Sequence, residues 1–141
     1  EQDGWRAKPH QDSIKRFERK LKKLTKRSWS VSMDYRIKKL NQVIRGWINY
    51  FRMGSMKKIL EKIDGRLRTR MRIVIWKQWK TREKRLWGLR KLKVGEEYAI
   101  QSVGCADHYQ VVAKTYGLRF GITKEILTKR GLLSCLDYYL N

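Results

Sequence analysis

The stretch Leu40-Asn41-Gln42-Val43-Ile44-Arg45-Gly46-Trp47-Ile48-Asn49-Tyr50-Phe51 organises the first half of this chain. Its apolar residues recur at helical spacing, so one face of a helix carries Ile37, Leu40, Ile44, Trp47, Ile48 and Phe51. Gly46 lies inside this pattern, where glycine costs about 1 kcal/mol relative to alanine. We therefore expect a close neighbour at Gly46: first a tightly packed helix, and second an approaching nucleic-acid duplex.

Two more amphipathic helices flank this one. The first is expected over about Ser13 to Arg27, with Ser13 as N-cap and an apolar face of Ile14, Phe17, Leu21 and Leu24. The central helix follows a cap at Ser30 or Ser32 and ends near Gly54. The third begins near Ser55 or Met56, and Gly65 bends or divides it. Its apolar face holds Ile59, Leu60, Ile63, Leu67, Met71, Ile75 and Trp79. Three such helices with short connectors predict a three-helix bundle.

The remainder of the chain predicts shorter helices near 96–103, 108–116 and 124–130. Thr123 is expected to cap the last of these and Gly131 to end it. Gly88 and Gly95 bracket a hinge-like segment, and residues 132–140 form an apolar end that docks on its own subdomain or on a neighbour. No segment alternates as a strand would. The predicted fold is mainly α, with a three-helix bundle over 1–80 and a small helical subdomain over 81–141.

The charge of the chain is strongly positive and uneven. Its 141 residues include 35 Lys+Arg and 13 Asp+Glu, a net charge of +22. Residues 1–90 hold 28 of these bases and 8 acids, whereas residues 91–141 hold 7 and 5. A folded domain with such charge repels itself, and a polyanion relieves the repulsion. The composition therefore indicates DNA or RNA as partner, with an anionic membrane surface as the main competitor.

Catalytic chemistry is not predicted for this chain. His10 and His108 have no partner at a useful spacing, and no close aspartate pair follows a strand. Two cysteines, Cys105 and Cys135, are too few for a four-ligand zinc site, and we expect free thiols. No apolar run approaches the length of a membrane span. We therefore predict no catalytic residue, no metal site and no cofactor.

Binding residues are expected on the basic faces of the first and third helices, where tryptophans are interleaved with arginines. Arg66, Arg70, Lys77 and Lys84 recur at spacings of four and seven, near one helical face. Trp79 follows the apolar register and is expected in the core, whereas core and base-stacking roles are equally balanced for Trp76. The candidate nucleic-acid-binding residues are Lys20, Lys23, Lys26, Arg27, Arg45, Arg66, Arg68, Arg70, Arg72, Trp76, Lys77, Lys80, Arg82, Lys84 and Arg85.

Several segments resemble one known family. Leu40-Asn41 with Arg45-Gly46-Trp47-Ile48-Asn49-Tyr50-Phe51 resembles the maturase-specific region of group II intron reverse transcriptases. Residues 9–25 resemble the start of that family's thumb (also called domain X). Ile75-Trp76-Lys77-Gln78-Trp79-Lys80 resembles its tryptophan-lysine segment, and residues 113–136 its C-terminal stretch.

The resemblance implies a protein that binds its own intron RNA, assists splicing and copies the intron by target-primed reverse transcription. It implies a thumb over 1–80 and a DNA-binding domain over 81–141. Its implied partners are group II intron RNA, RNA–DNA duplex, target DNA and upstream fingers and palm domains of the same polypeptide. The palm's Tyr-Ala-Asp-Asp type motif is not in this sequence, so we expect no polymerase chemistry here. The implied location is the bacterial cytoplasm or an organelle, in a nucleoprotein.

A different class of function remains open at this point. A basic helical module could dock on an acidic protein or on an anionic membrane surface, with the aromatic end of the central helix as its partner site. Preference for anionic liposomes over structured RNA would distinguish this alternative.

Overall fold

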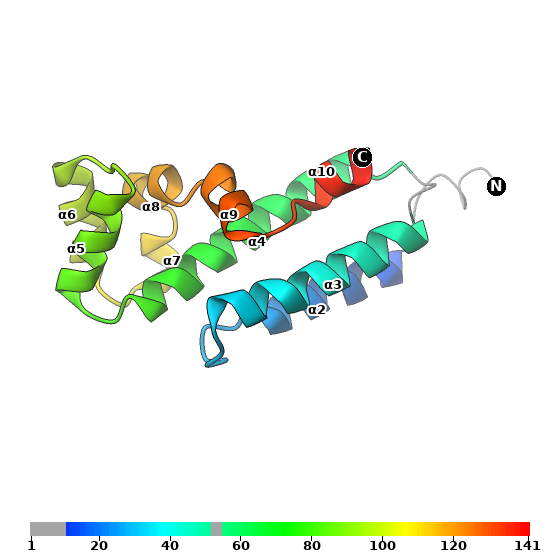
Figure 1. Cartoon of the computed structure of the whole chain (residues 1–141), viewed down its shortest axis with the longest axis horizontal. Helices are drawn as coiled ribbons and strands as arrows, with labels where there is room; N and C mark the ends of the chain where they lie inside the picture. Colours follow the sequence, from blue (N-terminus) through cyan, green and yellow to red (C-terminus); the bar gives the residue numbers. More distant parts are fainter. Residues whose placement is uncertain (1–10, 52–54) are drawn as a thin grey trace. The chain divides into compact units, whose positions relative to one another are not determined.

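The computed structural model describes residues 11–51 and 55–141, and every regular element in these ranges is an α-helix (Figure 1). The prediction of a mainly α fold is therefore confirmed. The chain forms two compact units: one contains the residues up to Leu67 together with Thr128–Asn141, and the other contains Arg68–Leu127. The boundary between these compact units lies inside α4 (Lys57–Gln78), and the C-terminal segment belongs to the first unit. The functional division into 1–80 and 81–141 stays a prediction.

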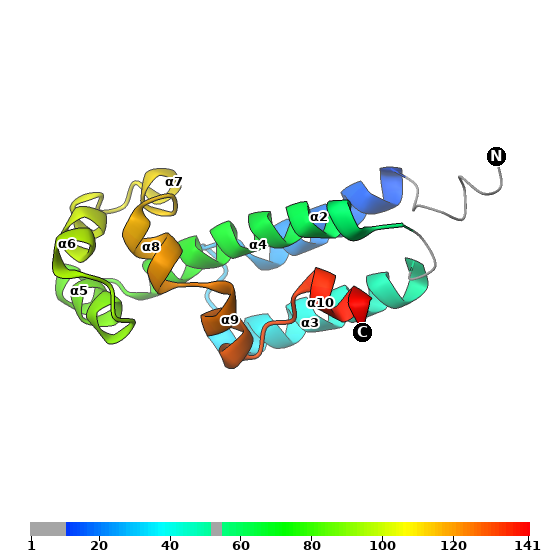
Figure 2. The ribbon, with the colours of Figure 1, turned by 90° about the horizontal axis from the view of Figure 1, so that it is seen from above.

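The first unit is built on α2 (Gln11–Leu24) and α3 (Met33–Phe51), which lie side by side in Figures 1 and 2. Phe17 and Leu21 of α2 and Leu40, Ile44 and Ile48 of α3 are buried as predicted. The predicted faces are only partly buried at their ends, at Leu24, Trp47 and Phe51. The Phe17 ring also stacks on Trp47, with centroids 4.4 Å apart. Ser13 lies inside α2, so its predicted role as N-cap is wrong. The predicted end of the central helix near Gly54 lies outside the described residues.

The turn between α2 and α3 is closed by a buried arginine. Arg36 is 1 % exposed, and its guanidinium donates to the carbonyl oxygens of Leu24 at 2.7 Å, Lys26 at 3.1 Å and Trp29 at 2.5 Å. These carbonyls follow the end of α2, where a positive charge is favourable. The hydroxyl of Ser32 accepts the N–H of Tyr35 at 3.1 Å and starts α3. One of the two predicted caps is thus confirmed.

Helix α4 (Lys57–Gln78) runs through Gly65 without interruption. Leu60, Ile63, Leu67 and Met71 are buried as predicted, but Ile75 and Trp79 are only partly buried. Ile73, Val74 and Trp76 are buried in their place. The predicted stripe is wrong there because the second unit covers this half of α4 on more than one side.

The second unit contains the end of α4 with α5 (Arg82–Lys91), α6 (Glu96–Gly104), α7 (Tyr109–Val112) and α8 (Tyr116–Gly121), of which α5, α6 and α8 pack on one another. The helix predicted over 108–116 is shorter, because α7 ends at Val112 and Thr115 caps the next helix, α8, by accepting the N–H of Leu118. Gly88 lies inside α5 rather than at a hinge. A Cβ there would lie 2.8 Å from the Trp79 ring, so glycine permits this packing.

The C-terminal segment, with α9 (Lys124–Arg130) and α10 (Cys135–Leu140), returns to the first unit, and α10 packs on α3 (Figure 2). The Asp64 carboxylate on α4 accepts Ser134 Oγ at 2.8 Å and the backbone N–H groups of Cys135 at 2.7 Å and Leu136 at 3.0 Å. The Asn41 amide binds the same segment from α3: it donates to Gly131 O at 2.8 Å and accepts from Leu133 N at 2.9 Å. The expectation that the C-terminal end docks on its own subdomain is therefore wrong.

Tight helix packing at Gly46, the first of its two expected explanations, is wrong, and Gly65 does not divide α4. No described atom would lie within 4 Å of a Cβ at Gly46 or at Gly65, apart from chain neighbours and the helix backbone. Gly46 is exposed, so tight helix packing does not explain it. In contrast, the prediction that Thr123 caps α9 and Gly131 ends it is confirmed: Thr123 accepts the N–H of Ile126 at 3.2 Å, and Gly131 has a φ of 111°.

Candidate nucleic-acid interface

Helix α2 presents a basic stripe on the side opposite its buried face. Successive residues turn by about 100°, which places the stripe away from Phe17 and Leu21. Its members are exposed: Arg16, Arg19, Lys20 and Lys23. Lys26 and Arg27 are exposed in the turn that follows. Among the described residues, Lys20, Lys23 and Lys26 have no acidic side chain within 4.0 Å. Their charges are therefore available to an external anion.

Two further candidates in the first unit differ in their surroundings. Arg45 is exposed on α3, next to the exposed Gly46. Arg66 on α4 is exposed too, but its guanidinium forms an ion pair with Glu18 of α2 at 2.5 Å. The ion pair partly neutralises Arg66, so we expect less from it in anion binding than from Lys20 or Lys23.

Four basic candidates of the second unit are exposed around the end of α4 and the start of α5: Lys77, Lys80, Arg82 and Lys84. Because α4 ends at Gln78 and Thr81 begins α5, Lys84 does not continue the helical face of Arg70 and Lys77. The predicted four-residue face is therefore interrupted, and Arg70 on it is partly buried. Lys77, Lys80, Arg82 and Lys84, which we call the α4–α5 surface, are exposed.

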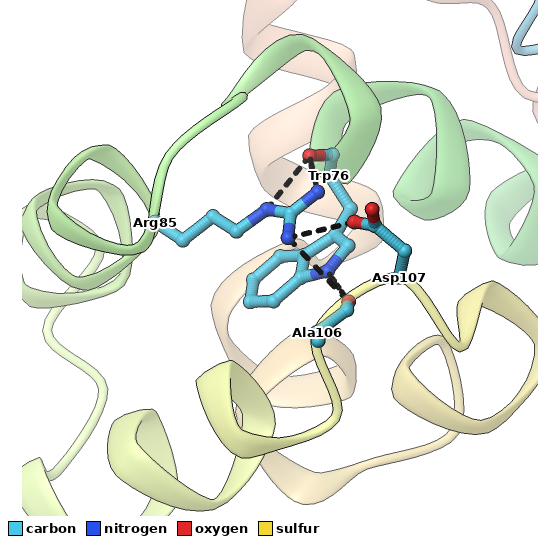
Figure 3. Close-up of polar contacts among 4 residues, drawn as sticks. All are labelled: Trp76, Arg85, Ala106 and Asp107. Carbon is cyan, nitrogen blue, oxygen red and sulfur yellow. Dashed lines mark hydrogen bonds and ion pairs between the residues drawn. The ribbon is translucent and has the colours of Figure 1, made fainter.

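Trp76 and Arg85 are interior residues that hold the second unit together (Figure 3). Trp76 is 0 % exposed, and its indole N–H donates to Ala106 O at 2.8 Å. The guanidinium of Arg85 donates to Trp76 O through Nε at 3.1 Å and Nη2 at 2.9 Å, and pairs with Asp107 at 3.1 Å. It also lies 4.6 Å from the Trp76 ring centroid. Neither side chain is free to contact a nucleic acid in this structure, so both leave the candidate interface.

Three arginines on α4 are partly buried. Burial lowers the pKa of Arg70 below its ordinary value. For Arg72, burial and then the positive charges of Arg68 and Arg119 lower the pKa to about 10. The Nε of Arg72 donates to Ile122 O at 2.9 Å, which fixes its guanidinium beside the end of α8. Arg68 lies one helical turn before Arg72 on α4, and Arg119 lies one turn before the Ile122 carbonyl that Arg72 contacts, so we call these three arginines one positively charged cluster.

The sequence did not single out Arg119, because it lies in the weakly charged last third of the chain. An exposed set of stacked rings was also missed: Tyr98 and Tyr116 have centroids 4.3 Å apart, and Tyr116 and Phe120 have centroids 4.0 Å apart. Only the spacing of Tyr116 and Phe120, one helical turn apart, could have indicated part of it.

The described residues offer neither a metal site nor a membrane-spanning helix. In residues 11–51 and 55–141, no three His, Cys, Asp or Glu side chains gather in a metal-binding arrangement. Both cysteines are free thiols; Cys105 is partly exposed and Cys135 is buried. No described helix combines the length and the apolar character that a bilayer crossing requires.

The comparison with known proteins gives one family. Residues 14–93 match the group II intron, maturase-specific domain, which is more than half of the chain. No curated protein matches the chain. The matched residues include α2, α3, α4 and α5 almost completely, and with them the Arg45–Phe51 segment that carried the sequence resemblance. The chain therefore belongs to the family of group II intron maturase-specific domains, the non-catalytic part of reverse-transcriptase-related proteins that act in splicing of group II introns.

Proposed function

We propose that this chain binds group II intron RNA directly, through the exposed lysine and arginine side chains of α2 and of the α4–α5 surface. The observation that carries the proposal is the unneutralised charge on a well-packed helical scaffold. Lys20, Lys23 and Lys26 face solvent without an acidic partner in the described part of the chain, while the aromatic residues beneath them are used in packing. A stripe of free cations on a rigid helix is suited to a polyanion.

The proposed mechanism is electrostatic docking. Each lysine or arginine that neutralises a phosphate releases condensed counterions, which drives association. A-form RNA helices offer phosphates and 2′-hydroxyls across a shallow minor groove and hide most base edges. Specificity for the intron would then come from the folded shape of the RNA. The chain performs no chemistry in this proposal; it binds the RNA and orients it.

The finer assignments follow from the resemblance and belong to the same proposal. Residues 1–80 would act as the thumb and contact the template–primer duplex, and residues 81–141 would contact target DNA. Fingers and palm domains of the same polypeptide would lie upstream and supply polymerase activity. The complex would work in the bacterial cytoplasm or in an organelle, as a nucleoprotein.

Charge-removal variants test the proposal against a matched control. Lys20→Gln/Lys23→Gln removes two unpaired charges from α2. Arg90→Gln/Arg130→Gln removes the same charge from arginines that are already paired with Glu96 and Asp34. Filter binding to a structured group II intron RNA should show about a 10-fold larger Kd for the α2 variant, with a smaller change for the control. Equal losses in both variants would contradict a specific role for α2, and stronger binding to anionic liposomes than to RNA would favour a membrane partner.

A further inference from the structure

Three arginines of the second unit lie close together without a counter-charge. Arg68 and Arg72 are one turn apart on α4, and Arg119 lies on α8. Arg72 Nε contacts Ile122 O at the end of α8, three residues after Arg119, which brings the two helices together. Burial, and then the charges of Arg68 and Arg119, lower the pKa of Arg72. Among the described residues, none of the three has an acidic side chain within 4.0 Å. The like charges of these arginines repel one another, and no described carboxylate beside them reduces that repulsion.

The two fully buried described arginines have more internal acceptors than Arg72 has, although the Nε of Arg36 has none. Arg36 donates to three backbone carbonyls, and Arg85 donates to two and pairs with Asp107. Within residues 11–51 and 55–141, the structure gives Arg72 one acceptor, Ile122 O at 2.9 Å, which takes its Nε–H. A guanidinium has five N–H donors, so the two terminal nitrogens of Arg72 remain for an external acceptor. The contact with Ile122 O holds the group in place before any ligand arrives.

We propose that Arg68, Arg72 and Arg119 form a phosphate-binding site that holds a backbone phosphodiester of an unpaired nucleic-acid strand. Guanidinium groups match the oxygen geometry of phosphate and bind it through paired N–H donors. Three positive charges around one phosphate would also remove the mutual repulsion. The site rests on the proposed function for its biological ligand, although its affinity for phosphate can be tested without RNA.

The surroundings of Arg119 favour an unpaired strand over a duplex. On α8, Gly117, Leu118 and Gly121 are buried, whereas Tyr116, Arg119 and Phe120 share the exposed side. The rings of Tyr116 and Phe120 are 45 % and 58 % exposed and stack with each other. Aromatic rings beside a phosphate site offer a surface on which an unstacked base can lie. Bases inside a duplex are already stacked and could not use it.

The first test measures anion binding alone, with thermal unfolding of the whole chain in chloride and in inorganic pyrophosphate at equal ionic strength. We expect pyrophosphate to raise the Tm of the wild type. Arg119→Gln should have a higher Tm than the wild type in chloride, because repulsion is relieved, and should lose at least half of the rise in pyrophosphate. Lys114→Gln, which removes one exposed charge from the same unit, should keep the full rise. Equal rises in all three proteins, or no rise in any, would overturn the site.

The second test identifies the strand, using fluorescence anisotropy with labelled 12-nucleotide single-stranded RNA, single-stranded DNA and their duplexes. Arg119→Gln should weaken single-strand binding and lower the salt slope by about one, whereas Lys114→Gln should not. If pyrophosphate stabilises the wild type but no RNA binds, the proposed function fails and the phosphate site stands. If RNA binds and Arg119→Gln changes neither the salt slope nor the pyrophosphate response, the phosphate site fails and the proposed function stands. A preference for duplex over single strands would overturn the assignment to an unpaired strand.

Discussion

Replacing Asp64 by alanine should release the C-terminal segment from the first unit. Asp64 is 6 % exposed, and its carboxylate accepts three hydrogen bonds of 2.7–3.0 Å from the start of α10. Hydrogen bonds to a charged group are stronger than neutral ones, and the helix N-terminus adds a favourable interaction with the negative charge. The hydroxyl of Ser134 can turn to water in the variant, but the N–H of Cys135 lies in a buried position and loses its only described acceptor.

The expected loss is about 2–4 kcal/mol in the free energy of docking, because the three bonds act together and one buried donor is left unsatisfied. A thiol reports this directly, since Cys135 is 0 % exposed and must become accessible before it reacts. Each 1.36 kcal/mol changes the equilibrium constant for local opening tenfold, and alkylation of Cys135 requires that opening. The rate of alkylation should therefore rise by about 30- to 1,000-fold. The assay follows iodoacetamide labelling by mass spectrometry at constant pH, with the partly exposed Cys105 as internal reference.

Two variants make the measurement specific. Glu61→Ala removes an exposed acid from the same helix and should leave the Cys135 rate unchanged. Asp64→Asn keeps the size of the side chain but loses the charge and should give an intermediate rate. If Asp64→Ala labels Cys135 at the wild-type rate, or if the wild type already labels Cys135 as fast as the unfolded chain, the docking argument is refuted.

Three other predictions follow from single sites. Arg36→Lys should lower the free energy of unfolding by about 2–3 kcal/mol in urea titrations, because an ammonium cannot reach three separate carbonyls as a guanidinium does; an unchanged midpoint would contradict this. Gly46→Ala should stabilise by about 0.5–1 kcal/mol, and Gly88→Ala should destabilise by about 1–3 kcal/mol because its Cβ meets Trp79; the opposite order of Tm would contradict the packing. Burial, and then the charge of Asp64, raise the pKa of Cys135, so the folded protein keeps a proton that the unfolded chain loses. Stability should therefore fall as pH rises above about 9, and comparison with Cys135→Ala isolates this contribution, which reaches about 1.4 kcal/mol per pH unit. An equal pH dependence in both proteins would refute the assignment.

The spacing of apolar residues predicted the buried face of a helix correctly where one neighbouring helix covers it. The spacing of Ile37, Leu40, Ile44 and Ile48 identified the buried face of α3, because residues three and four positions apart lie on the same face of a helix. The same reasoning was wrong for Trp79 and Ile75, because the second half of α4 is covered by helices that come later in the chain. A helix period cannot show how wide the covered face is.

Long-range polar contacts could not be predicted from the sequence. Asp64 and Cys135 are separated by about seventy residues, and no local signal distinguishes Asp64 from an exposed acid such as Glu61. Arg85 lies in a run of bases that look alike, yet it is the buried one because its guanidinium meets the Trp76 carbonyl at the end of α4. The phosphate cluster depends on Arg119 meeting Arg72 across about fifty residues. The roles of these residues become visible only in the tertiary structure, because their partners are distant in the sequence.

The most direct test of direct RNA binding is the salt dependence of affinity for an unspliced group II intron RNA. The dissociation constant is measured at several KCl concentrations between about 50 and 200 mM, a range in which six to ten phosphate contacts lower affinity by about 10³–10⁵. Many lysine and arginine side chains without an acidic partner among the described residues are exposed on α2 and on the α4–α5 surface. The logarithm of the association constant should therefore fall steeply with the logarithm of the salt concentration, with a slope of magnitude about four or more. A nearly flat plot, or equal affinity for an uncharged polymer, would contradict the account.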